Sequence, residues 1–220
     1  MKLAATWKSL PHGWRAVAAP VLLLLICGCQ ALRPAVSPHP SFYSLSGVGD
    51  NAAPASPVSR AVPSAPTLIV SPPHAAAGFD SQRMMYLRRA DQLEYFAHSE
   101  WVDTPARMLA PLVVAAVENT AAFRAVVQTP STAKGEMRLD TEILRLQHEF
   151  SSTPSQVRFT LRAYLVESAT RRVIESREFE AVIPSASENP RGGVVAANSA
   201  VQIVLAELST FCAEAARNRR

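Results

Sequence analysis

The second half of the sequence alternates between apolar and polar side chains with a period of two, the pattern of strands that bury one face. Met137–Ile143 and Leu144–Phe150 alternate in opposite phases, so we expect one long strand with a β-bulge near Ile143. Val157–Leu165 and Val173–Ile183 continue the alternation after short polar segments. Three successive strands of this kind favour an antiparallel sheet with one solvated face.

Weaker signals for other elements surround these strands. Asp103-Thr104-Pro105 is typical of a helix start, with a capping side chain and an early proline. Apolar residues then recur every three or four positions as far as Val117, and Pro111 should kink this helix near Arg107. The remaining expected elements are strands over 67–70 and 123–127, a hairpin of Met84–Arg88 and Leu93–Trp101 that turns across 90–92, a loop over 185–193 and an apolar-striped helix over 194–215.

Together these elements predict an α+β fold. We expect a mostly antiparallel sheet of six or seven strands, with two main helices covering one of its faces. The chain lacks the repeated strand–helix alternation that would favour a doubly wound parallel sheet. We place this domain at residues 67–216, followed by a basic tail at 217–220.

The N-terminus has the features of a bacterial lipoprotein signal. Its first fifteen residues carry the positive charges and are followed by an 11-residue apolar run, Ala16–Ile26, which is shorter than a membrane-spanning helix. The run ends in Ile26-Cys27-Gly28-Cys29, which resembles a lipobox. This resemblance predicts a signal peptide at 1–28, cleavage between Gly28 and Cys29, and lipid attached to Cys29. By resemblance to enterobacterial sorting signals, Gln30 in place of aspartate favours the inner leaflet of the outer membrane, and retention at the inner membrane is the alternative in other bacteria. A plain signal peptide or an uncleaved anchor is the alternative interpretation.

Residues 29–66 are expected to form a lipidated N-terminus and a tether. From Gln30 to Pro66 the sequence contains seven Pro, seven Ala and seven Ser, a composition that favours extended chain over a packed core. An apolar patch at 42–46 is expected to dock on the domain as a short strand. Beyond Cys29 the only cysteine is Cys212, so the fold must be held together by core burial rather than by a disulfide within the chain.

Charge and motifs exclude several function classes. Residues 1–28 contain three basic residues and no acid, so most of the formal net charge of +4 belongs to the signal; a nucleic-acid partner is not supported. The sequence lacks the nucleotide-binding, hydrolase and zinc-helix motifs, and it predicts no catalytic residue, metal site or cofactor. We interpret His98 and His148 as ordinary strand histidines, Cys212 as a buried hydrophobe, and the glutamates at 175, 178 and 180 as a solvated strand edge.

Aromatic and basic residues are densest between Met84 and Trp101. One interpretation is a hairpin whose aromatic side chains pair across strands into the core. Another is an apolar surface for a partner protein or lipid. The residues proposed for such a partner or ligand surface are Tyr86, Tyr95, Phe96 and Trp101.

The order of these features resembles the PqiC-like family of ABC-type transport auxiliary lipoproteins over nearly all of the mature chain. The resemblance rests on the lipobox, Phe42–Leu45, Leu68–Val70, Tyr86, Leu93, Tyr95, Trp101, Pro105, the 109–117 helix, Phe123–Val126 and the closing amphipathic helix.

This resemblance implies a non-enzymatic envelope protein, lipid-anchored and facing the periplasm, that works with an MCE-domain protein, a permease and an ATPase. Such systems move lipids or other hydrophobic molecules between membranes, and a homo-oligomer is compatible with that role. Two alternatives stay open. One is a stand-alone lipoprotein that binds lipid or a small molecule, which a deep apolar pocket under the hairpin would favour. The other is a structural envelope lipoprotein.

Replacing the predicted lipidation site tests the anchor. Cys29→Ala should move the protein from the membrane to the soluble fraction, because acyl chains contribute roughly 0.8 kcal/mol for each buried CH₂ group. Fractionation of cells followed by immunoblotting measures this. A variant that stays membrane-bound would contradict the lipid-anchor interpretation.

Overall fold

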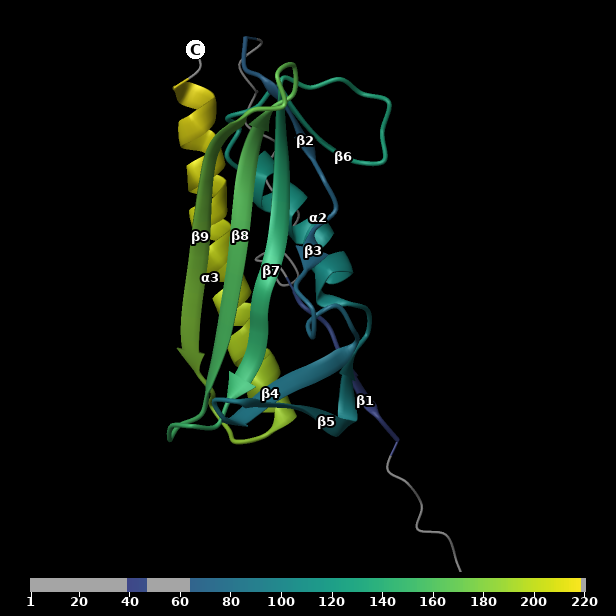
Figure 1. Ribbon diagram of the computed structural model, residues 1–220, viewed down its shortest axis with the longest axis vertical. Helices are drawn as coiled ribbons and strands as arrows, with labels where there is room; N and C mark the ends of the chain where they lie inside the picture. Colours follow the sequence, from purple (N-terminus) through teal and green to yellow (C-terminus); the bar gives the residue numbers. More distant parts are fainter. Residues whose placement is uncertain (1–38, 47–63, 219–220) are drawn as a thin grey trace, which may run out of the picture. The chain divides into compact units, whose positions relative to one another are not determined.

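The structure, a computed structural model, describes residues 39–46 and 64–218. They form one nine-stranded mixed sheet and two helices (Figure 1). The predicted signal, cleavage site and Cys29, and most of the predicted tether, lie outside the described residues. Within them the α+β class is confirmed, but the prediction of a mostly antiparallel sheet with six or seven strands is wrong.

The sheet is organised around the long strand β7, Met137–Glu149. On one side β7 pairs along its length with antiparallel β8, Gln156–Glu167, which pairs with antiparallel β9, Val173–Pro184. On its other side β7 pairs in succession with three short parallel strands, β2 (Thr67–Val70), β3 (His74–Ala75) and β4 (Arg83–Arg89). These parallel pairings make the sheet mixed.

Two outer branches complete the sheet. Beyond β2 lies parallel β6, Ala125–Gln128. Beyond β4 lies β5, Gln92–Trp101, as the second arm of an antiparallel hairpin. β1, Ser41–Tyr43, pairs with β5 in parallel and forms the outer edge of that branch. Thus a three-residue strand from the predicted tether belongs to the sheet.

The β-bulge predicted near Ile143 is confirmed. The register of β7 against β8 shifts between Ile143 and Arg145. Before the shift Leu139 and Ile143 are buried, and after it Leu146 and His148 point inward. The bulge therefore keeps apolar side chains on the core face over the whole strand.

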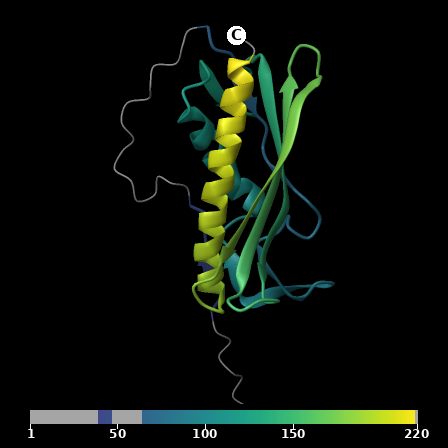
Figure 2. The ribbon, with the colours of Figure 1, turned by 90° about the vertical axis from the view of Figure 1, so that its left-hand side faces the viewer.

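The helices α2, Pro105–Glu118, and α3, Pro190–Arg217, pack against each other on one side of the sheet (Figure 2). The predicted start of α2 at Pro105 is confirmed, but the predicted capping is not, because the Thr104 side chain makes no capping hydrogen bond. Pro111 lies inside this helix. α3 is long and apolar enough to cross a bilayer, but one apolar face of it is buried in the domain, while Val195 and Ile203 are exposed. The buried side chains include Val201, Leu208 and Phe211.

α3 begins four residues earlier than predicted, so the end of the expected 185–193 loop is helical. Asn189 caps the helix by accepting a hydrogen bond from the Gly192 backbone N–H, and Pro190 follows at the first helical position. Glycine is unfavourable in a helix interior, but a Cβ on Gly193 would lie 2.6 Å from His148 Nδ1. The close approach of α3 to β7 thus requires the glycine that suggested a loop.

Candidate functional site

The β4–β5 hairpin, where the sequence placed its candidate residues, projects from one end of the domain (Figure 2). Met85 lies opposite Tyr95, and Tyr86 lies opposite Glu94. Because successive residues of a strand point to opposite faces, the candidate residues divide between two faces. The hairpin joins them in sequence but not on one surface.

The inner face holds three of the four candidates. Tyr86 and Trp101 are buried and Phe96 is half-buried. The rings of Tyr86 and Phe96 have centroids 4.6 Å apart, and the Tyr86 hydroxyl donates a hydrogen bond of 2.8 Å to Glu94. That bond is the main cause of the raised pKa of Tyr86, with burial second. These contacts give Tyr86 a packing role in the fold.

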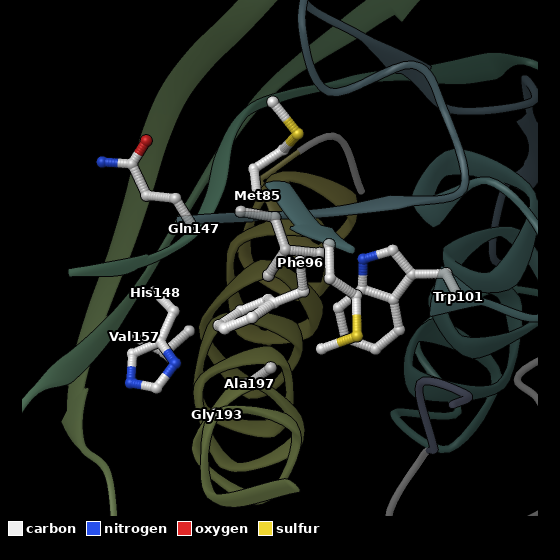
Figure 3. Close-up of a pocket in the computed structure, with 10 residues that line it drawn as sticks. Met85, Phe96, Trp101, Gln147, His148, Val157, Gly193 and Ala197 are labelled. Carbon is white, nitrogen blue, oxygen red and sulfur yellow. The ribbon is translucent and has the colours of Figure 1, made fainter. Parts of the chain in front are cut away.

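Beside the inner face lies a small apolar cavity (Figure 3). Phe96 lies in this view between His148 and Trp101, with Gly193 and Ala197 of α3 below it. The cavity has a volume of about 20 Å³, which is room for about one water molecule. It is not the deep apolar pocket that a carrier of a whole lipid would need under this hairpin.

A buried histidine connects this cavity to the start of α3. His148 Nε2 lies 2.8 Å from Ser155 Oγ, and the Ser155 backbone N–H donates to the Glu188 carboxylate at 2.8 Å. His148 Nδ1 is buried with no hydrogen-bond partner and faces Gly193. Burial lowers the pKa of His148, although the Glu188 charge opposes the shift. The folded protein therefore favours the neutral imidazole.

The outer face of the hairpin is apolar and open. We call it the hairpin face: Phe42, Arg83, Met85, Leu87, Leu93, Tyr95 and Val102, the last of which follows β5 directly and donates its backbone N–H to the Tyr43 carbonyl of β1. Cross-strand pairing puts Met85 beside Tyr95, and Leu87 beside Leu93. The Arg83 guanidinium lies 4.3 Å from the centre of the Tyr95 ring. In the strand register, Arg83 of β4 and Phe42 of β1 lie opposite the same residue of β5, Glu100.

Of the sequence candidates only Tyr95 belongs to the hairpin face. Sequence reasoning did not include Phe42, Leu93 and Val102 among the site residues. The period-two alternation along β5 carries a signal for Leu93, since it shares a face with Tyr95. No local signal identifies Phe42, because its place follows from pairing with a strand far along the chain.

The solvated face of β7, β8 and β9 carries paired charges. Arg158 contacts Glu149 at 2.8 Å and Glu180 at 2.7 Å, and Arg162 contacts Glu178. Burial would raise the pKa of Glu149, but hydrogen bonds led by the one from Arg158 outweigh burial and lower it. The glutamates at 178 and 180 thus face arginines, as expected of a solvated face rather than an acid–base pair.

The other chemically reactive groups are also placed. Cys212 is fully buried, and burial raises the pKa of its thiol to about 12, so it remains protonated. Among residues 39–46 and 64–218 no group of three or more His, Cys, Asp or Glu side chains could hold a metal ion. A larger open depression of about 520 Å³ lies near the start of β7, lined by residues that include Ile69, Lys134 and Arg138.

Comparisons with known proteins identify the fold and the family. The family model described as ABC-type transport auxiliary lipoprotein component matches residues 43–209. The crystal structure of protein XCC0632 from Xanthomonas campestris, assigned to family DUF330, is 24% identical, with a TM-score of 0.65; the match covers 72% of this chain and 92% of that chain. That of an uncharacterized protein is 14% identical, with a TM-score of 0.56, and covers 80% and 97%. At these identities the structural likeness shows the fold alone. Among curated proteins, no relative matches the chain.

Truncating Trp101 and Tyr95 separately tests the assignment of the two faces. Trp101→Ala should lower the free energy of unfolding by about 3–5 kcal/mol because it removes a large core side chain. Tyr95→Ala should cost less than about 1 kcal/mol because it removes an exposed ring and one cation–π contact. Urea unfolding followed by circular dichroism measures both. A stable Trp101→Ala protein that has lost a partner would instead place Trp101 in an interface.

Protonation of His148 should destabilise the fold below neutral pH. The unfolded chain binds a proton near the usual histidine pKa of about 6.5, whereas the folded protein binds it only at lower pH. The free energy of unfolding should therefore fall between pH 7.5 and 5.5, by up to about 1.4 kcal/mol for each pH unit below 6.5. His148→Gln should remove this slope, and His98→Gln, which changes an exposed histidine, should retain it. Equal slopes in both variants would contradict the assignment.

Proposed function

The chain belongs to the ABC-type transport auxiliary lipoprotein component family, and from that membership we propose that it is a lipid-anchored auxiliary subunit of an envelope transport system. The observation that carries the proposal is the match of the family model to residues 43–209, which takes in β2 to β9, α2 and most of α3. The lipobox at Cys29 adds the anchor, and Gln30 favours the inner leaflet of the outer membrane, facing the periplasm.

We propose further that the system moves lipids or other hydrophobic molecules, and that the partners are an MCE-domain protein, a permease and an ATPase. The sequence lacks a phosphate-binding loop motif, so the energy for transport would come from another chain. A homo-oligomer is part of this proposal and is measured by the mass of the purified complex.

The geometry supports action by contact rather than by catalysis. Cys212 is buried and protonated, and Glu178 and Glu180 are paired with arginines. His148 has Ser155 beside one ring nitrogen, but its other nitrogen faces the backbone of α3. None of these groups presents an activated nucleophile to an open pocket.

The alternative of a stand-alone carrier has less support from the geometry. A carrier has to enclose its ligand in an apolar pocket of several hundred Å³. The cavity beside the hairpin has about 20 Å³, and the larger depression near β7 is open and lined partly by charged side chains. A purely structural envelope lipoprotein is the second alternative, which the experiment below distinguishes.

Co-purification of the lipidated protein tests the proposal. A tag placed after Arg220, with gentle solubilisation of the envelope, should recover an MCE-domain protein and its permease, identified by mass spectrometry of proteins and lipids together. The matched control is the tagged Cys29→Ala chain, which should recover less of these partners because it no longer shares their membrane. A protein recovered alone with stoichiometric lipid would favour the stand-alone carrier. Recovery of neither would favour the structural role.

A further inference from the structure

The hairpin face holds a concentration of exposed apolar side chains. Seven large apolar residues of the described ranges are exposed, and four of them lie on this face: Phe42 (59%), Tyr95 (50%), Val102 (49%) and Leu93 (40%). Met85 and Leu87 are half-buried between them. Apolar side chains gathered on one face of a projecting hairpin indicate a contact surface rather than chance exposure.

The position of β1 relates this face to the predicted anchor. Phe42 belongs to β1, the first described strand, and the first residue of β1, Ser41, is twelve positions after Cys29 in the sequence. The segment between Cys29 and Ser41 can span at most roughly 40 Å. A lipid on Cys29 therefore keeps β1, and Phe42 with it, within about that distance of the bilayer, where even a weak affinity of the hairpin face for lipid leads to contact.

The charges of the hairpin specify the kind of lipid contact. Between residues 83 and 101 there are three arginines and three acidic residues, and two of these charges, Arg88 and Glu94, lie 3.9 Å apart. A balanced set has no net attraction to anionic headgroups. Contact with a bilayer would instead come from the apolar side chains, with the amphipathic ring of Tyr95 at the level of the headgroups.

We propose that the hairpin face contacts the surface of the bilayer that holds the Cys29 lipid. This inference rests on the lipid anchor of the proposed function and adds a second, non-covalent contact to it. Phe42, Leu93 and Val102 enter the interface, and the hairpin end of the domain faces the membrane. The opposite end, with the C-terminus of α3, then faces the periplasm and the transport partners.

Fluorescence quenching by brominated lipids tests this contact. The lipidated mature chain, whose only tryptophan is Trp101, is reconstituted as Tyr95→Trp or as Tyr164→Trp in vesicles of phosphatidylethanolamine and phosphatidylglycerol with brominated acyl chains. Tyr164 lies half-buried on β8, opposite Asp140 of the solvated sheet face. Tyr95→Trp should lose emission and shift to the blue, and Tyr164→Trp should match the quenching of the wild-type chain. Equal quenching in the two variants overturns the proposal.

A second measurement separates this contact from the anchor. The Cys29→Ala chain should bind the same vesicles only at high lipid concentration, with little dependence on salt, and Phe42→Ser with Tyr95→Ser should abolish this binding. Both residues are exposed, so the double variant should fold, as circular dichroism checks. A lipidated chain that floats with vesicles without quenching at position 95 retains the anchor and overturns the docking. A lipidated chain that does not float with vesicles contradicts the lipid anchor. In that case, binding of the Cys29→Ala chain to vesicles still tests the membrane contact of the hairpin face.

Two other outcomes would assign the hairpin face to a different occupant, and each overturns the proposal. If Tyr95→Trp is already shielded from a soluble quencher such as iodide without vesicles, another part of the chain covers the face. If lipid quenching is absent and Tyr95→Ser reduces recovery of the transport partners, the face is a protein interface.

Discussion

The fold depends on the pairing of β7 along both of its edges. One edge is matched to β8 over its full length, and the other is shared by β2, β3 and β4 in sequence. Short strands have few hydrogen bonds and little burial of their own, so their order in space is fixed by the strand that they all join. Pairing with β7 therefore fixes the position at which the β4–β5 hairpin leaves the sheet.

The register shift in β7 also determines which of its side chains face the helices. Because side chains alternate along a strand, inserting one residue moves every later side chain to the other face. Without the shift at Ile143, His148 would point to solvent rather than toward α3. The ring occupies the space that a side chain on Gly193 would need. The bulge, the buried histidine and the glycine of α3 are thus one packing arrangement.

The sequence predicted the elements whose signals are local and missed those that depend on pairing. The bulge in β7 and the start of α2 at Pro105 were predicted because alternation and an early helical proline are visible within a few residues. The parallel pairings were not predicted, because the sequence of a four-residue strand does not indicate which strand it pairs with. β3 has only two residues, too few for any period. The start of α3 was missed because Gly193 serves a tertiary contact at the expense of local helix propensity.

The same reasoning explains why the candidate site was found only in part. Both faces of the hairpin carry aromatic residues, so composition marks the segment without telling the inner Tyr86 from the outer Tyr95. The period-two rule separates them, but only the packing of Tyr86 against Phe96 decides which face is inside.

The place of β1 also has a mechanical consequence. With the lipid proposed for Cys29, any pull from the membrane would enter the described part of the fold through β1, a three-residue strand held at the sheet edge. The core begins two residues farther along, at the buried Leu45, and most of it lies under the other strands and helices. Under load β1 would separate from β5 first, because only three residues hold it there, and each residue freed from Ser41 to Ser44 would lengthen the connection to the membrane by roughly 3.3 Å. The edge strand would thus detach before the buried residues of the core carry the load.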